Sequence, residues 1–248
     1  MEKLGKWVEQ SKNIVLFTGA GVSAESGIPT YRGRDGYWEK YDPDKYANID
    51  YFFKDPSYYW NFFKEVRYPV LENAKPNIAH KSIAKLEKMG RIKSVITQNI
   101  DGLHREAGSE NILELHGNTR MFSCIGCKAE FAMAEINDLL GQSLPPRCSH
   151  CGGTIRPQVV FFGETLDPDI LKRARQDSFQ SDLFIAAGSS LVVQPAASLP
   201  LIAKQNSAKL AIINIDPTPL DSMADIVLNI SVSRVFSKII TGSDHLAH

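Results

Sequence analysis

Five short apolar runs, each ending in a turn residue, are typical of strands buried on both faces of a parallel sheet. The runs cover residues 13–18, 94–97, 183–187, 209–214 and 225–230. Between some of them, apolar positions recur at helical spacing, and helices are predicted at 77–89, 169–179 and 196–204. Strands alternating with helices predict an α/β fold built on a mostly parallel sheet.

Two segments interrupt this alternation. Residues 31–75 are dense in aromatic residues and lysines, and they contain no run of the parallel-strand kind. Residues 120–156 contain all the cysteines and are broken by two consecutive prolines. We expect both segments to be insertions that together form a second, smaller domain. The larger domain would then consist of residues 1–30, 76–119 and 157–248.

The cysteines stand in two tight pairs, Cys124 with Cys127 and Cys148 with Cys151. Each C-x-x-C can turn two thiolates toward one point, and four thiolates suit a tetrahedral Zn²⁺ ion. Four protein ligands leave no open coordination position, so we predict a structural zinc site. Two disulfides would instead need an oxidising compartment, and the charged N-terminal residues do not read as a secretion signal.

Composition narrows the functional classes. The 248 residues carry a formal net charge of zero, which disfavours direct nucleic-acid binding because such proteins normally have a basic excess. No apolar stretch approaches the ~18 residues of a membrane-spanning helix. Free cysteines placed for a metal fit a reducing compartment, so we expect a cytoplasmic protein.

Small residues follow two of the predicted strands. The first strand leads into Gly19, Ala20, Gly21 and Ser23. A glycine-rich turn between a strand and a helix lets backbone N–H groups approach a pyrophosphate. Taken alone, this motif also fits a simple tight turn. The strand at 183–187 leads into Gly188, Ser189 and Ser190, which we expect at the same edge of the sheet.

Polar side chains follow two other strands. Asn214 and Asp216 stand where they can bind ribose hydroxyls, although they also suit the start of a turn. Gln98, Asn99 and Asp101 follow the strand at 94–97. Burying such groups unpaired costs about 1–3 kcal/mol each, so they either face a ligand or cap the next helix. Asp101 is a good N-cap candidate.

His116 lies between an apolar run and Gly117, at the junction of the two expected domains. Imidazole is the natural general base near neutral pH. A lone histidine is more often structural or exposed, so the local pattern by itself leaves the role of His116 open.

Taken together, these motifs resemble the sirtuins in order and spacing. The matching segments are 19–29, 31–33, 97–104, 115–118, the two C-x-x-C pairs, 160–164, 188–190 and 214–216. The resemblance covers residues from about 13 to about 230. It implies an NAD-consuming protein-lysine deacylase with a Rossmann-like large domain. The small domain would combine a helical insertion and a zinc-ribbon insertion, with the active site in the cleft between the domains.

The resemblance also implies the chemistry. The acyl-lysine carbonyl oxygen would attack the nicotinamide ribose, nicotinamide would leave, and His116 would act as general base for a ribose hydroxyl. The products would be free lysine, nicotinamide and O-acyl-ADP-ribose. Asn99 and Asp101 would form the nicotinamide pocket, with Ile28 and Ile100 as its walls.

Further contacts follow from the same resemblance. Residues implied to bind the phosphates and riboses of NAD are Gly19, Ala20, Gly21, Ser23, Arg32, Gln98, Gly188, Ser189, Ser190, Asn214 and Asp216. The protein substrate would pair as an extended strand with Val159, Val160, Phe161, Phe162, Gly163 and Glu164, and with Val193 and Gln194 on its other side. Such pairing gives affinity through the backbone and little sequence selectivity.

One departure from the family concerns the acyl group. Sirtuins that prefer succinyl- or malonyl-lysine carry a Tyr-x-x-Arg pair in the helical module. Aligned on Trp60, the corresponding residues here are Phe63 and Val66, which cannot hold a carboxylate. Arg67 is one position further, about 100° round a helix. We therefore expect acetyl groups, and longer neutral acyl groups, to be preferred.

Two other functions remain open at this point. Mono-ADP-ribosyl transfer would use the same cleavage of NAD with a different acceptor. A non-catalytic zinc-ribbon module that recruits partners is a second alternative, although zero net charge and polar strand ends argue against it.

Overall fold

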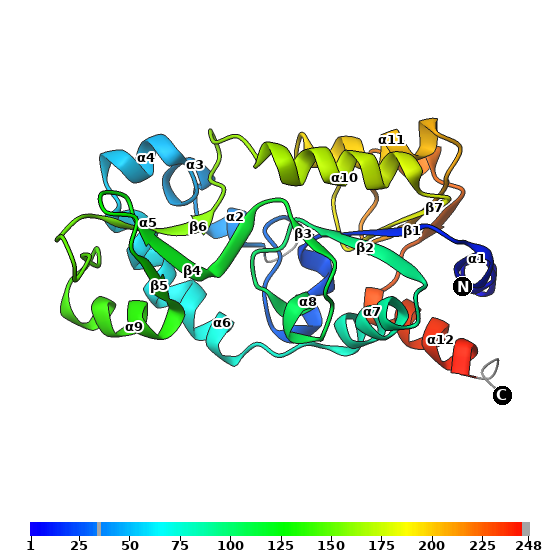
Figure 1. Cartoon of the computed structure of the whole chain (residues 1–248), viewed down its shortest axis with the longest axis horizontal. Coiled ribbons are helices and arrows are strands. Elements are labelled where there is room, and N and C mark those ends of the chain that lie inside the picture. Colours follow the sequence, from blue (N-terminus) through cyan, green and yellow to red (C-terminus); the bar gives the residue numbers. More distant parts are fainter. Residues whose placement is uncertain (34–35, 245–248) are drawn as a thin grey trace.

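The computed structural model describes residues 1–33 and 36–244. A six-stranded parallel sheet with the order β3-β2-β1-β7-β8-β9 forms the centre of the large domain (Figure 1). Its strands are β1 (Ile14–Thr18), β2 (Ile92–Thr97), β3 (Ile112–Glu114), β7 (Leu183–Ala187), β8 (Lys209–Ile213) and β9 (Ile226–Leu228). The strand order reverses between β1 and β7, and ligands of open α/β sheets bind outside the carboxyl ends of strands at such a point.

The expected α/β class is confirmed, and all five predicted strands are present. The sixth, β3, was not predicted as a separate strand. It has only three residues, and its pairing with Val95, Ile96 and Thr97 of β2 decides its conformation more than its own short pattern does.

Helices cover both faces of the sheet (Figure 1). One face carries α1 (Glu2–Gln10), α7 (Ile78–Lys88) and α12 (Val232–Asp244), and the other carries α10 (Pro168–Gln180) and α11 (Leu199–Gln205). Short helical turns occur at α8 (Leu103–Glu106), η1 (Ala20–Val22), η2 (Ala24–Ser26), η4 (Ala196–Ser198) and η5 (Asp221–Met223).

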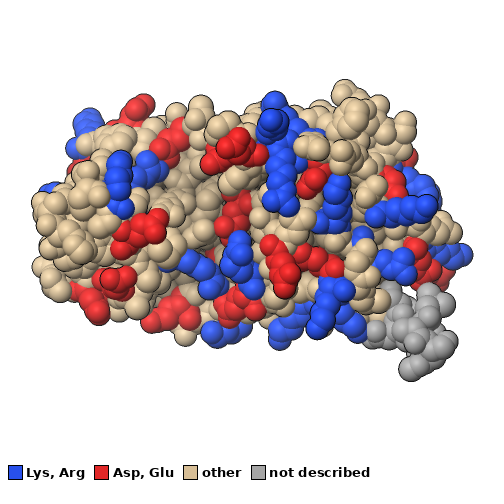
Figure 2. All heavy atoms as spheres, viewed as in Figure 1, with Lys and Arg blue, Asp and Glu red and all other residues tan. Residues whose placement is uncertain are grey.

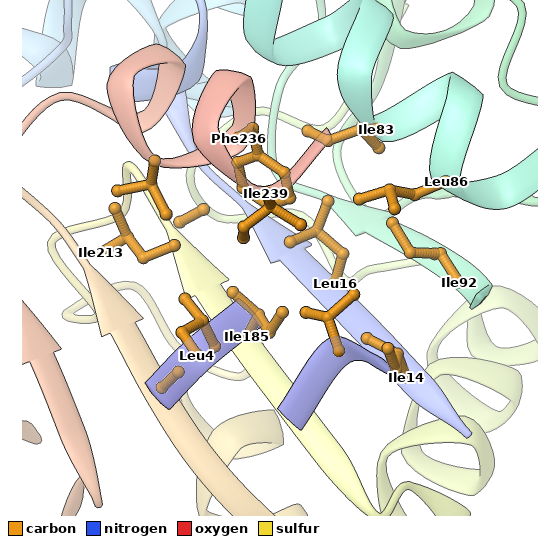
Figure 3. Close-up of a cluster of buried hydrophobic side chains, with 14 of the residues drawn as sticks. Leu4, Ile14, Leu16, Ile83, Leu86, Ile92, Ile185, Ile213, Phe236 and Ile239 are labelled. Carbon is orange, nitrogen blue, oxygen red and sulfur yellow. The ribbon is translucent and has the colours of Figure 1, made fainter. Parts of the chain in front are cut away.

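Successive residues of β1 point to opposite faces and enter two separate cores. Leu16 packs with Leu86 of α7 and Phe236 of α12 in one core (Figure 3). Val15 and Phe17 pack in the other core, which includes residues of α10 and α11. Burial of each large apolar side chain in these cores contributes about 1.5–3 kcal/mol to the free energy of folding. The strands are therefore fixed on both faces, which makes their carboxyl ends a rigid platform.

The small domain combines helices with a three-stranded antiparallel sheet of order β5-β4-β6. Its helices are α2 (Tyr37–Lys40), α3 (Pro43–Tyr46), α4 (Ile49–Lys54), α5 (Ser57–Phe62), a π-helical turn (Phe63–Arg67), α6 (Tyr68–Asn73) and α9 (Met133–Gln142). Its strands are β4 (Gly117–Cys124), β5 (Glu130–Ala132) and β6 (Ile155–Val159). Both insertions share one core, in which Trp60 and Phe63 meet Phe122. This sheet extends beyond the expected insertion at 120–156 on both sides.

Among the described residues, no helix has the length and apolar character needed to cross a membrane. Acidic and basic side chains alternate over the face shown in Figure 2, in keeping with a net charge of zero.

Candidate active site

A cavity of about 780 Å³ lies outside the carboxyl ends of the parallel strands and is bounded by both domains. Most of the predicted site residues line it: Gly19, Ala20, Gly21, Arg32, Gln98, Asn99, Ile100, His116, Val159, Val160, Phe161, Phe162, Gly163, Glu164, Gly188, Ser189, Ser190, Val193, Gln194, Asn214 and Asp216. Of the residues expected to contact NAD, the substrate peptide or the acyl group, five do not line it: Ser23, Ile28, Phe63, Val66 and Asp101. Most of the predicted motifs, although far apart in the sequence, therefore line the same cavity.

The glycine-rich turn packs directly on the end of β7. The Gly19 and Gly21 N–H groups donate to the carbonyls of Ala187 and Gly188, at 3.1 and 2.8 Å. A Cβ atom at Gly21 would stand 2.8 Å from Gly188 Cα, so a side chain there would force the two loops apart. The glycines thus allow close backbone packing. The expected helix after the turn is absent, and two short 3₁₀ turns, η1 and η2, take its place.

Asp101 and Asn99 meet at a buried hydroxyl behind the cavity wall. Ser23 Oγ donates to Asp101 Oδ2 at 2.7 Å and accepts from Asn99 Nδ2 at 3.1 Å. The other carboxylate oxygen of Asp101 accepts from the Leu103 N–H at 2.9 Å. Asp101 therefore accepts from the first N–H of α8 and, through Ser23, holds the amide of Asn99, but it does not itself line the cavity.

Two histidines that sequence reasoning passed over extend this network. His80 Nε2 lies 3.4 Å from Ser23 Oγ, and His104 Nε2 lies 3.0 Å from Thr18 Oγ1. Their rings are 4.9 Å apart. His80 Nδ1 also accepts from the Asn77 N–H at the start of α7. The signal available in the sequence was the Asn-x-x-His spacing, which matches a reciprocal helix cap.

Burial lowers the pKa of both histidines, His80 to about 4 and His104 well below its ordinary value. The unfolded chain then binds more protons than the folded chain below pH ~6.5, so stability is full above that pH and falls as the pH drops toward 4. We expect His80 alone to remove about 2 kcal/mol of unfolding free energy between pH 7.5 and 5. Urea unfolding at the two pH values measures this, and an equal stability at both would contradict it.

A backbone carbonyl positions the imidazole of His116. Its Nδ1 lies 3.0 Å from the Gln98 carbonyl oxygen. A carbonyl can only accept, so Nδ1 carries the proton and the Nε2 lone pair is left as a base. Burial, together with the nearby charge of Arg32, lowers the pKa of His116. The imidazole is therefore neutral at pH 7, as a general base must be.

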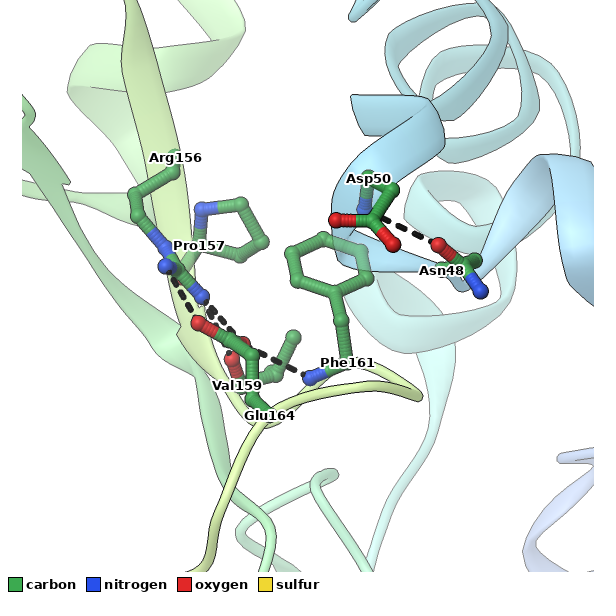
Figure 4. Close-up of polar contacts among 7 residues, drawn as sticks. All are labelled: Asn48, Asp50, Arg156, Pro157, Val159, Phe161 and Glu164. Atoms are coloured by element: carbon green, nitrogen blue, oxygen red, sulfur yellow. Dashed lines mark hydrogen bonds and ion pairs between the residues drawn. The ribbon is translucent and has the colours of Figure 1, made fainter. Parts of the chain in front are cut away.

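The segment after β6 is held by an arginine–carboxylate pair (Figure 4). Arg156 binds Glu164 through two hydrogen bonds of 2.8 and 2.7 Å and also donates to the Val159 carbonyl. Glu164 accepts from the Phe161 N–H at 2.9 Å. Burial opposes ionisation of Glu164, but the bonds from Arg156 and Phe161 outweigh it and lower its pKa. The Glu164 carboxylate is thus engaged within the protein and shapes residues 160–164.

Residues 160–164 also form backbone hydrogen bonds with the helical insertion and with His116. The Phe162 N–H donates to the Ala47 carbonyl at 2.8 Å, and the Phe162 carbonyl accepts from the Ile49 N–H at 3.0 Å. The Val160 N–H donates to the His116 carbonyl at 2.9 Å. Any strand that adds here must therefore use backbone groups other than those of Phe162 and the N–H of Val160.

The two expected acyl-contacting residues do not reach the cavity. Phe63 is fully buried and packs with Trp60 and Phe122 at 5.5 Å between ring centroids. Val66 does not line the cavity either, whereas Arg67 does. The expectation that Arg67 turns away is wrong because the helix makes a π-helical turn at 63–67, where the Tyr68 N–H bonds to the Phe63 carbonyl five residues back. Tyr31, Tyr59 and Phe62 also line the cavity and were missed.

The four cysteines converge as expected. Their sulfur atoms all lie within 4.8 Å of one another, with Cys124 and Cys148 buried and Cys127 and Cys151 exposed. The sulfurs of Cys124 and Cys151 are 3.4 Å apart, far longer than the ~2.05 Å of a disulfide. Four sulfurs at ~2.3 Å from a tetrahedral zinc ion lie roughly 3.8 Å from one another. The residues fit zinc.

Known proteins are similar to almost the whole chain. The model of the Sir2 family matches residues 19–195. NAD-dependent protein deacylase 1 of Archaeoglobus fulgidus is 46% identical over 239 residues, which is 96% of each chain. An NAD-dependent protein deacetylase of Saccharolobus solfataricus is 46% identical over 240 residues, 96% of this chain and 95% of the relative.

Solved structures agree with this. A Sir2 complex with a p53 peptide and NAD⁺ has a TM-score of 0.91 at 40% identity, and the match covers 98% of both chains. A Sir2 complex with deacetylated p53 peptide and 3′-O-acetyl ADP-ribose has a TM-score of 0.94 at 41% identity, again over 98% of both chains. The chain belongs to the Sir2 family.

Proposed function

We propose that this protein uses NAD to remove acetyl groups from the lysines of other proteins, with His116 as the general base. The observation that supports this most strongly is the position of His116. Its Nδ1 lies 3.0 Å from the Gln98 carbonyl oxygen, and the residue lines a cavity bounded by both domains. The deacylase and deacetylase relatives named above support the same activity.

The reaction converts acyl-lysine, NAD and water into lysine, nicotinamide and O-acyl-ADP-ribose. NAD supplies the ribose carbon that takes the acyl oxygen as nicotinamide leaves with the electron pair of the broken bond. His116 Nε2 takes the proton of a ribose hydroxyl, whose oxygen then attacks the acyl carbon. The lysine nitrogen leaves as its bond to that carbon breaks, and water completes the acyl ester.

The other residues around the cavity bind the separate parts of NAD. The turns at 19–21 and 188–190 receive the phosphates, with Gln98 and Arg32 beside the ribose, and Asn214 and Asp216 bind the adenosine ribose. Asn99, fixed by Ser23 and Asp101, orients the nicotinamide group. This assignment is supported by their common position at the carboxyl ends of the parallel strands.

We further propose that the protein substrate lies as an extended strand between residues 159–164 and residues 193–194. Both segments line the cavity that contains His116. We place the protein in the cytoplasm, because a four-thiolate zinc site needs reduced cysteines. Zero net charge supports a protein substrate and not a nucleic-acid partner.

The test is an acetyl-lysine peptide incubated with the protein, with and without NAD, followed by mass spectrometry. Loss of the acetyl group together with NAD-dependent release of nicotinamide is expected. A peptide or protein that gains ADP-ribose and keeps its acetyl group would identify a mono-ADP-ribosyltransferase. No nicotinamide release with any acylated peptide would exclude both activities.

A further inference from the structure

A buried cation of the helical insertion contacts both ends of the loop between η2 and α2. Arg67 lines the cavity and is only 6% exposed. Its Nη1 donates to the Tyr31 hydroxyl, and its guanidinium lies 5.3 Å from the Tyr31 ring and 5.4 Å from the Tyr37 ring. Aromatic faces attract such a cation, and the attraction is stronger where water is excluded. Arg67 therefore holds the side chains of this loop against the helical insertion.

Backbone hydrogen bonds close the same loop at its base. The Tyr37 N–H donates to the Thr30 carbonyl at 2.9 Å, and the Trp38 N–H donates to the Tyr31 carbonyl at 3.0 Å. The Thr30 hydroxyl donates to the Arg32 carbonyl at 2.8 Å. Since Tyr31 and Arg32 are adjacent in the chain, fixing the Tyr31 side chain also restricts the backbone of Arg32.

Arg32 depends on these neighbours for its position. It lines the cavity, its side chain is exposed, and its charge acts on His116. In the part of the chain that the structure describes, no ion pair includes Arg32. The hydrogen bond from Thr30 to its carbonyl and the anchored ring of Tyr31 therefore determine where this charge stands.

The loop also reaches the residue proposed to bind the adenosine ribose. Gly33 has a φ of +84°, and a Cβ atom on it would stand 3.1 Å from Asp216 Oδ2. Asp216 lies beyond β8, at the opposite side of the cavity from the helical insertion. Residues 31–33 therefore connect the helical insertion with the carboxyl end of β8, and their position affects the whole of the proposed NAD site.

We propose that Arg67 is a positioning residue for NAD and that it acts through Tyr31. By anchoring Tyr31, it holds Arg32 and Gly33 in place before NAD binds, so less conformational entropy is lost on binding. The phosphates are proposed to lie at the turns 19–21 and 188–190 of the large domain, so Arg67 acts through the loop and not by direct contact. The inference rests on the proposed function, in which NAD occupies this cavity.

The experiment measures binding of ADP-ribose by titration calorimetry, because ADP-ribose has both phosphates and both riboses of NAD but cannot release nicotinamide. Arg67→Met should weaken ADP-ribose binding about tenfold, because the charge-assisted bond to Tyr31 is lost. KM for NAD should rise by a similar factor, while KM for an acetyl-lysine peptide stays within about twofold. Arg175→Met, which removes an exposed arginine of α10, is the matched control and should change none of these values.

A double-mutant cycle tests whether the effect of Arg67 passes through Tyr31. Tyr31→Phe keeps the ring and removes only the hydroxyl, and it should weaken ADP-ribose binding about threefold. In the Arg67→Met background the same change should have no effect, because the partner of the hydroxyl is gone. If Arg67→Met does not fold, Arg67→Lys takes its place in the cycle, since lysine keeps the charge but not the planar fork.

Three results would overturn the positioning role. Equal effects of Tyr31→Phe in both backgrounds would show that Arg67 does not act through the hydroxyl. A lower melting temperature of the Arg67 variant with unchanged ADP-ribose affinity would leave Arg67 a structural role only. A higher KM for the acetyl peptide with unchanged ADP-ribose affinity would assign Arg67 to substrate binding.

Deacetylation of the same peptide separates this inference from the proposed function. If ADP-ribose binding follows the predicted pattern but the peptide keeps its acetyl group, the proposed function fails and the positioning role stands. If the peptide is deacetylated and all variants bind ADP-ribose like the wild type, only the positioning role fails. A wild type that neither binds ADP-ribose nor deacetylates the peptide overturns both.

Discussion

Replacing His116 with alanine is expected to lower kcat for deacetylation by about 10²–10⁴-fold. Burial and the nearby charge of Arg32 lower the pKa of His116, which favours a neutral imidazole at pH 7. Its Nδ1 bond to Gln98 leaves Nε2 for the substrate. The variant loses this base and one hydrogen bond, so its melting temperature and zinc content should stay close to those of the wild type.

Steady-state kinetics with an acetyl-lysine peptide measure this effect, and metal analysis with thermal unfolding checks the fold. His150→Ala is the matched control, because His150 is exposed in the zinc module and does not line the cavity. Its turnover should equal that of the wild type. More than half of wild-type turnover in His116→Ala would remove His116 from the mechanism.

The sheet was predictable because its strands are buried on both faces. A strand such as β7, with all five residues buried, must be apolar throughout, and such a run stands out in the sequence. The helices α1 and α12 at the two ends were not predicted. They bury only one stripe each against the sheet, so their sequences mix apolar residues such as Leu4 and Phe236 with many polar ones.

The site was predictable where polar or small residues follow a buried strand. Gly19, Asn99 and Ser189 stand out because they interrupt an apolar run at a position where parallel strands end together. The pattern gives no such signal for His80 or His104. Both lie within helices, and only the folded chain brings them to Ser23 and Thr18.

The position of Arg67 was beyond sequence reasoning for a different reason. Helical periodicity assumes 3.6 residues per turn, and one extra residue in a π-helical turn rotates every later side chain. Phe63 remains in the core with Trp60, while Arg67 is carried to the cavity wall. An alignment that counts positions from Trp60 without this extra residue therefore selects Val66, whereas Arg67 is the residue that lines the cavity.

Removing the zinc site is expected to unfold the small domain. Zinc binding by structural cysteine sites is worth about 10–16 kcal/mol in isolated zinc fingers, and this binding energy is folding energy. Cys124 and Cys148 belong to the same buried core as Phe122 and Trp60. We expect the double variant Cys124→Ala with Cys148→Ala to lose zinc, to melt at a much lower temperature and to aggregate more readily.

Deacetylase activity should fall as a consequence, because two strands of the zinc module, β4 and β6, lead directly to residues of the candidate active site. Strand β4 begins directly after His116, and β6 ends at Val159, where the proposed substrate segment starts. Ser149→Ala, in the same C-x-x-C loop, is the control and should keep both zinc and activity. Elemental analysis gives the metal content, with one Zn²⁺ per chain expected in the wild type. A protein that holds no zinc when purified without chelator, or a variant lacking all four cysteines that stays stable and fully active, would show that the cysteines have another role.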